Sequence, residues 1–157
     1  MARLTSAMQS FVDRQRLGFV ATVCPDGTPH LSPQGTLAVW TDAVLVFAEV
    51  ASPVTIRNLI ENPACEINVV DPWVRKGYRF RGRARLLLMG PTFDRLLEFY
   101  RRRDVDMSVH HMVLVDVDEV EPVVSPVYAL GWSERAVRDK WREYWRRELA
   151  GKRRRNS

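Results

Sequence analysis

The chain of 157 residues suits one domain with a sizeable core, and its 46% hydrophobic content is that of a globular protein rather than a disordered one. It has no signal-peptide pattern at its N-terminus and no run near the ~20 apolar residues that a membrane-spanning helix needs. Its two cysteines, Cys24 and Cys65, form no C-x-x-C pair, which indicates reduced thiols in a cytoplasmic protein rather than a disulfide scaffold or structural zinc.

The net charge of +5 is concentrated at the C-terminus. Residues 133–157 carry ten basic and four acidic side chains, whereas residues 1–132 carry 14 basic and 15 acidic ones. A basic chain can indicate a nucleic-acid partner. The nearly neutral body and the lack of a basic stripe interleaved with aromatic residues argue against that partner.

The first elements are a helix and three strands. An amphipathic pattern predicts a helix over residues 3–16, with Gly18 ending it. Strands are expected over residues 19–24, 29–40 and 43–50. Because their connections are tight turns, too short for parallel crossovers, they predict an antiparallel meander.

A second helix is predicted over residues 52–62, since Ser52 suits the N-cap, Pro53 the first helical position, and Pro63 the end. The pattern then predicts a helix over residues 92–103, capped by Thr92. Further strands are expected over residues 64–70, 78–89, 111–117 and 122–129.

The last helix is predicted over residues 133–150. Apolar side chains recur along it at spacings of three and four, which predicts a docked helix with an aromatic seam of Val137, Trp141, Tyr144, Trp145 and Leu149. The basic residues 151–157 are expected to form a disordered tail. About six antiparallel strands with peripheral helices predict a mainly β fold, a small β-barrel with a C-terminal helix, in one domain over residues 1–150.

The start of the second helix is the first candidate site. Ser52, Thr55 and Arg57 crowd its first turns, where backbone amides carry partial positive charge and can bind a phosphate. Hydroxyl groups and a guanidinium would complete such a site. The alternative, in which Ser52 only caps the helix and Arg57 faces solvent, remains open.

The second candidate site includes Arg75, Lys76 and Gly77, in a loop where glycine permits close approach of the backbone to a ligand. In the strand that follows, four arginines alternate with small or apolar residues, and period two places their guanidinium groups on one face. That face could bind an anion or could be a solvated face paired with acids on a neighbouring strand. The four are Arg79, Arg81, Arg83 and Arg85.

Catalytic patterns are otherwise scarce. The histidines His30, His110 and His111 have no metal-ligand spacing, so no metal site is predicted. The sequence holds no dinucleotide fingerprint, phosphate-binding loop or nucleophile elbow. Any chemistry would therefore come from a cofactor.

Three motifs, in this order, resemble those of pyridoxamine 5'-phosphate oxidase-like FMN-binding proteins, and the resemblance covers about residues 5–130. They are Gly18-Phe19-Val20-Ala21-Thr22-Val23 followed by Pro25-Asp26-Gly27-Thr28-Pro29-His30-Leu31-Ser32-Pro33, then Ser52-Pro53-x-Thr55-x-x-Asn58-Leu59-x-x-Asn62-Pro63, and finally Arg75-Lys76-Gly77-Tyr78-Arg79-Phe80-x-Gly82. The family fold is a split β-barrel that forms a homodimer with FMN at the subunit interface.

The resemblance also implies the cofactor-binding residues. It places the flavin beside Ser32, Pro33, Gln34, Gly35, Thr36, Ala48 and Glu49. It places the phosphate at Ser52, Val54 and Thr55, with Arg57, Arg75, Lys76 and Gly77 nearby. Many members carry Lys or Arg where this chain has Val54 or Thr55, so phosphate binding is expected to rely on Arg57 and Lys76.

The resemblance implies an FMN-dependent oxidoreductase that acts on a small molecule, with the substrate unassigned. The C-terminus departs from the substrate-binding signature of the vitamin-synthesising oxidases, which argues against pyridoxamine phosphate oxidation. No catalytic residue is identified, and Tyr78 and His30 are only conceivable proton donors. Two alternatives remain, a deazaflavin-dependent reductase and a non-catalytic FMN-binding carrier.

Overall fold

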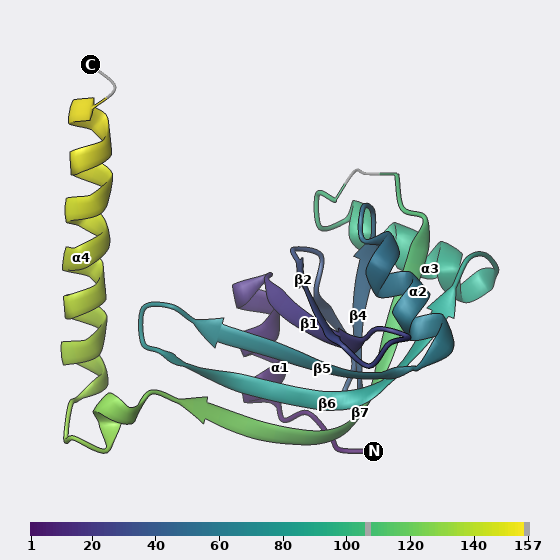
Figure 1. The fold of residues 1–157 in the computed structure, drawn as a ribbon, viewed down its shortest axis with the longest axis horizontal. Helices are drawn as coiled ribbons and strands as arrows, with labels where there is room; N and C mark the ends of the chain where they lie inside the picture. Colours follow the sequence, from purple (N-terminus) through teal and green to yellow (C-terminus); the bar gives the residue numbers. More distant parts are fainter. Residues whose placement is uncertain (106–107, 156–157) are drawn as a thin grey trace. The chain divides into compact units, whose positions relative to one another are not determined.

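The computed structural model describes residues 1–105 and 108–155, with side chains described up to residue 150. The chain divides into two compact units, the first Met1–Val69 with Tyr78–Glu121 and the second Val70–Gly77 with Pro122–Ser157. Seven strands form one antiparallel sheet, and the helices of the first unit lie beside it (Figure 1). The prediction of a mainly β, antiparallel fold with peripheral helices is confirmed.

The helices are α1 (Ser6–Gln15), α2 (Pro53–Glu61), α3 (Pro91–Arg101) and α4 (Glu134–Arg155), and a short 3-10 helix spans Pro126–Tyr128. The strands are β1 (Gly18–Val23), β2 (Pro29–Gln34), β3 (Ala38–Thr41), β4 (Val44–Glu49), β5 (Ala64–Asp71), β6 (Lys76–Leu87) and β7 (His111–Val124). Their order in the sheet is β2-β1-β5-β6-β7-β4-β3.

The predicted meander of the first three strands is wrong. The expected strand over residues 29–40 is broken after Gln34, and its halves β2 and β3 lie at opposite edges of the sheet. The physical cause is Thr36, whose hydroxyl accepts a hydrogen bond from the Ala48 amide at 3.0 Å and donates one to the Ala48 carbonyl at 2.9 Å. These bonds hold the chain beside β4, and β3 then pairs with β4.

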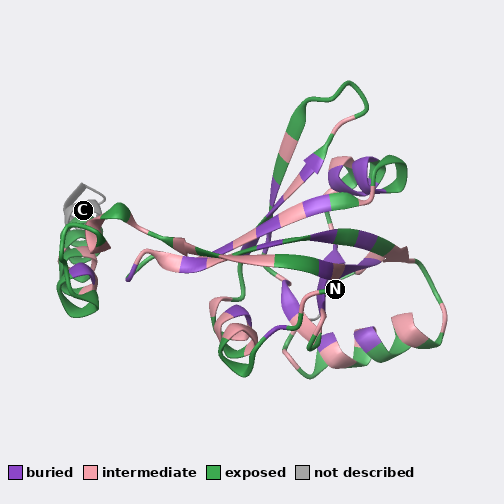
Figure 2. Cartoon of the chain, turned by 90° about the horizontal axis from the view of Figure 1, so that it is seen from below, coloured by how far each residue is buried: buried purple, intermediate pink, exposed green. Residues whose placement is uncertain are grey.

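Strand β4 is buried on both faces because two apolar clusters lie on opposite sides of it. Leu45 and Phe47 belong to the cluster that also holds Ile56 of α2. Val46 and Ala48 belong to the cluster that holds Leu96 and Tyr100 of α3. Along β1, β5 and β6, by contrast, buried residues alternate with more exposed ones, so mainly one face of each strand is covered; Figure 2 colours the chain by this burial.

Two predicted helix ends are wrong. Arg16, with φ of 51°, caps α1, because Gly18 is already paired with Gln34 in the β1–β2 ladder. Gly90, with φ of 105°, precedes α3, where Thr92 was expected as the cap. The α2 prediction is confirmed, since Pro53 begins this helix and Asn62 follows its last residue.

In the second unit, the Ser133 hydroxyl accepts a hydrogen bond from the Ala136 amide at 3.2 Å at the start of α4. The expected docked seam is only partly correct, because Val137 is buried whereas Tyr144, Trp145 and Leu149 are exposed. The backbone of α4 continues to Arg155, beyond the expected end at residue 150. The last two residues of the expected tail, 156–157, lie outside the described residues.

None of the helices in the described part of the chain has both the length and the hydropathy needed to cross a membrane.

Candidate functional site

A cavity of about 500 Å³ in the first unit lies where β2 ends and α2 begins. We call it the first cavity. Its volume falls in the range of small-molecule sites. It is lined by Ser32, Pro33, Gln34, Gly35, Thr36, Ala48, Val50, Ala51, Ser52 and Val105. Seven of the expected cofactor residues are thus brought together here, and none of these ten described lining residues is charged.

A cluster of polar side chains from β2 and the start of α2 opens into the first cavity. The Gln34 side-chain amide donates to the Ser32 hydroxyl at 3.0 Å and to the Ser52 hydroxyl at 3.2 Å. The Ser32 hydroxyl in turn lies 3.4 Å from that of Ser52. Ser32 and Gln34 are buried. Ser52 is the N-cap residue of α2, but its side chain makes no capping hydrogen bond.

Two residues expected at the phosphate do not line this cavity. Thr55 is fully buried on the core side of α2, and its hydroxyl has no hydrogen-bond partner among the described residues. Val54 is half-buried and also lies outside the lining. Nearby, the buried Asn58 amide donates to the Thr22 hydroxyl at 3.0 Å, which holds α2 on β1.

A second cavity, of about 750 Å³, lies on the other side of the β4–α2 connection. It is lined by Glu49, Val50, Ala51, Pro53, Ile56, Arg57, Ile60, Glu61, His110 and His111. Glu49 and Arg57, both expected at the cofactor, therefore face this cavity instead of the first. The strand period explains the separation, since successive side chains of β4 point to opposite faces and Ala48 lines the first cavity.

The second cavity contains a buried carboxylate, Glu49, whose side chain is 4% exposed. One of its oxygens accepts a hydrogen bond from the Ser52 amide at 2.5 Å, and the other lies 3.2 Å from His111 Nδ1. His110 Nδ1 is farther from the same oxygen, at 3.9 Å.

No motif in the sequence connects these histidines with Glu49. The link is tertiary, because Glu49 and His111 are directly opposite in the antiparallel register of β4 and β7. No local spacing in the sequence could have shown it.

Arg75, Lys76 and Gly77 belong to the second unit. There the Arg75 guanidinium lies 3.6 Å from the ring centroid of Trp141. The Lys76 ammonium lies 3.1 Å from the Glu134 carboxylate, and this contact is the main cause of the lowered pKa of Glu134. Both cations thus have partners on α4, and their role at a cofactor stays a prediction.

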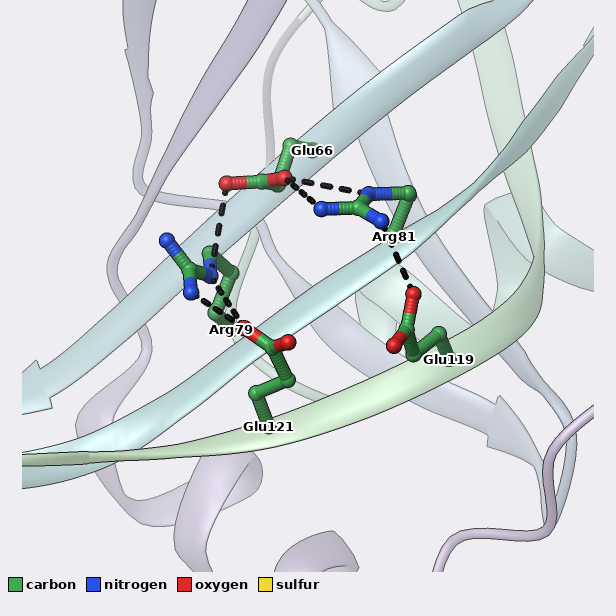
Figure 3. A network of polar contacts seen from close by, with 5 residues as sticks. All are labelled: Glu66, Arg79, Arg81, Glu119 and Glu121. Carbon is green, nitrogen blue, oxygen red and sulfur yellow. Dashed lines mark hydrogen bonds and ion pairs between the residues drawn. The ribbon is translucent and has the colours of Figure 1, made fainter.

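The arginine face of β6 is paired with acids, which decides between the two interpretations of that strand. Arg81 lies 3.3 Å from Glu66 on β5 and 2.9 Å from Glu119 on β7, and Arg79 pairs with Glu66 and Glu121 (Figure 3). Arg85 lies 2.6 Å from Asp116. For these three arginines the face is therefore a solvated one with cross-strand ion pairs.

Comparison with known proteins gives a family and several similar structures. HupZ of Group A Streptococcus is 27% identical, with a TM-score of 0.70 over 78% of this chain and 95% of that one. A protein described as an F420 reductase is 25% identical, with a TM-score of 0.58 over 75% of this chain and 98% of that one.

An FMN-binding protein from Syntrophomonas wolfei is 17% identical, with a TM-score of 0.63 over 75% of this chain and 84% of that one. At that identity the likeness shows the fold alone. The comparison with curated proteins gives no match. The family model of pyridoxamine 5'-phosphate oxidase matches residues 4–124, so the chain belongs to the pyridoxamine 5'-phosphate oxidase-like family and has its split-barrel type of fold.

Proposed function

We propose that the first cavity binds FMN and that the protein is an FMN-dependent oxidoreductase acting on a small molecule. The observation that carries this proposal is the cluster of Ser32, Gln34 and Ser52, whose polar groups open into a cavity of ligand size instead of capping α2. Family membership supports the choice of cofactor.

The residues of the first cavity fit a flavin nucleotide in kind. The Gln34 amide and the hydroxyls of Ser32 and Ser52 can hydrogen-bond to flavin carbonyls or to phosphate oxygens. Ala48, Val50, Ala51 and Val105 supply apolar surface for the ring. When bound, the flavin would supply the hydride or electron transfer, while these residues hold and orient it. Because the described lining is uncharged, the phosphate would be bound by neutral groups.

A deazaflavin is the second candidate for the same cavity. The chain is 25% identical to a structure described as an F420 reductase, and a deazaflavin also combines a tricyclic ring with a phosphate. A protein that takes up the deazaflavin but not FMN would belong to that second cofactor class.

The family resemblance implies a homodimer, and we also propose that the second copy of the chain covers the outer face of β1 and β2. Phe19 and Val23 of β1 and Leu31 of β2 are 44%, 41% and 61% exposed. The register places Ala21 opposite Leu31, so these apolar side chains share one face at the edge of the sheet. Sedimentation equilibrium tests this, because Leu31→Lys should shift a dimer toward monomer, and a monomeric wild type would refute the proposal.

The first experiment is a visible absorption spectrum of the purified protein, followed by titration with FMN and with a deazaflavin. Gln34→Leu removes the central donor of the polar cluster and should weaken FMN binding about tenfold. Gln15→Leu, the same change on α1, is the control and should leave FMN affinity unchanged. Wild-type protein that binds neither cofactor would refute the proposal.

Binding without turnover would point to the non-catalytic alternative. Reduced nicotinamide oxidation by the FMN-loaded protein, measured against free FMN, distinguishes an enzyme from a carrier. A rate no higher than that of free FMN would support the carrier.

A further inference from the structure

The second cavity combines apolar lining residues with an ionisable pair in which Glu49 is buried and His111 is half-buried. Five of its ten described lining residues are apolar, namely Val50, Ala51, Pro53, Ile56 and Ile60. Glu49 and His111 lie on adjacent strands at its edge, and the Glu49 carboxylate is buried. An apolar cavity with a few convergent polar groups is the usual form of a small-molecule site.

The hydrogen bonds of Glu49 define which ring nitrogen of His111 can accept a hydrogen bond from a ligand. A carboxylate only accepts hydrogen bonds, so His111 Nδ1 is the donor in the 3.2 Å contact with Glu49 Oε2. The other carboxylate oxygen is held by the Ser52 amide. His111 Nε2 has no hydrogen-bond partner among the described residues, and in this tautomer it is an acceptor.

The pair is arranged to accept a proton from a ligand. If Nε2 takes a proton, the imidazolium that forms is already beside the Glu49 carboxylate, which stabilises its charge. The charged groups around His111 are Glu49 from β4, Arg57 and Glu61 from α2, and the neighbouring His110. Of these, Arg57 can also stabilise an anion formed in the cavity.

We propose that the second cavity is a binding site for an apolar aromatic molecule with a weakly acidic hydroxyl group, of the phenol class. The aromatic body lies against Ile56 and Ile60, and the hydroxyl donates to His111 Nε2. In the step that follows, the O–H bond breaks and an N–H bond forms at Nε2. The products are a bound phenolate and an imidazolium paired with Glu49, so charge and atoms balance.

The binding site rests on the cavity and the Glu49–His111 pair alone. Its use as the substrate pocket of a flavin enzyme rests on the proposed function, and is consistent with Val50 and Ala51 lining both cavities. The two proposals fail separately, because the experiment below uses protein without flavin.

The probe is 4-nitrophenol, whose phenolate is yellow whereas the neutral phenol is not. Titration of the full chain at a constant pH should give saturable binding and a larger phenolate fraction for the bound probe than for the free one. Nitrobenzene, which lacks the hydroxyl, is the matched ligand and should bind at least about tenfold more weakly.

Three variants test whether 4-nitrophenol binding and its phenolate enrichment depend on the Glu49–His111 pair. His111→Gln should weaken 4-nitrophenol binding about ten- to a hundredfold, as expected for loss of a charge-assisted hydrogen bond. Glu49→Gln should abolish the phenolate enrichment while the Ser52 contact is kept by the amide oxygen. His30→Gln, on β2 and outside the cavity lining, should change neither quantity.

Equal binding of 4-nitrophenol and nitrobenzene, or unchanged binding by a folded His111→Gln variant, would overturn the proposal. The proposal would also be overturned if the affinity for 4-nitrophenol falls as the protein concentration is raised, because a second copy of the chain would then occupy the second cavity. If Glu49→Gln does not fold, His111→Gln still decides the question.

Discussion

The Tyr100 hydroxyl donates a hydrogen bond to the Thr36 carbonyl at 2.9 Å, across 64 residues of sequence. Tyr100 is buried, and burial raises the pKa of its hydroxyl, so the group stays protonated and remains a donor at neutral pH. Thr36 is also tied to Ala48. Helix α3 therefore holds the β2–β3 connection, which forms part of the lining of the first cavity.

Tyr100→Phe should destabilise the protein by about 1 kcal/mol, because the Thr36 carbonyl loses its partner while the ring is retained. The measurement is the midpoint of urea unfolding followed by circular dichroism. FMN affinity should fall as well, since the loop that carries Gly35 and Thr36 is held less firmly. Tyr144→Phe, on the exposed face of α4, is the control. Equal stability of the two variants would contradict this account.

Arg57→Ala should reduce the affinities for FMN and for riboflavin equally, or leave both unchanged, because Arg57 lines the second cavity. Ser52→Ala should lower FMN affinity more than riboflavin affinity if its hydroxyl binds the phosphate. Titration of each variant with both ligands gives its ratio of FMN affinity to riboflavin affinity. A loss confined to FMN in Arg57→Ala would restore the phosphate role that the resemblance implied.

Gly82→Ala should destabilise the fold by about 2 kcal/mol or more, because the added methyl group would lie 2.2 Å from the Asp116 carbonyl oxygen. That oxygen belongs to the backbone of β7, so it cannot move aside as a flexible side chain could. Gly35→Ala is the matched control, since its added methyl group meets nothing within 4 Å. Unfolding midpoints that fall equally in both variants would show that the strands do not approach closely at Gly82.

Asp116 should make stability depend on pH in the acidic range. Its hydrogen bond to Arg85 lowers the pKa of the Asp116 carboxyl below its usual range. A lowered folded-state pKa contributes stability above the unfolded-state pKa of about 3.9, and that contribution is lost as pH falls through the folded-state value. The pair is partly exposed, so the effect should be below about 1 kcal/mol.

The comparison is between wild type and Asp116→Asn from pH 2 to 7. The wild-type advantage in unfolding free energy should be constant above about pH 5 and should shrink below about pH 4. If the wild-type advantage in unfolding free energy instead grows as pH falls, the Asp116–Arg85 pair does not stabilise the fold in the way described.

Features that depend on neighbours within a few residues were predictable. Pro53 at the start of α2 and the alternation of arginines along β6 are both local patterns, and both are confirmed. The ordered motifs also identified the family, because they are short segments whose residues can be matched one by one.

The cation partners were only partly predictable. Pairing of the β6 arginines with acids was one of two interpretations, and the partners of Arg79 and Arg81 depend on which strands flank β6. The contact of Arg75 with Trp141 links residues 66 positions apart, in a unit built from two segments that are separate in the sequence. From the sequence, only a cation in a loop and an aromatic residue on a later helix could be predicted.

Most of the strands and helices, and the family, could thus be predicted from the order of residues, since turn chemistry and side-chain period act over a few positions. The division of the expected cofactor site between two cavities could not be predicted in this way. Ala48 and Glu49 are consecutive, yet they line different cavities because a pleated strand sends them to opposite faces. The break at Thr36 moves β3 to the far edge, and the β4–β7 register joins Glu49 to His111. Those pairings are long-range, and only the assembled sheet decides them.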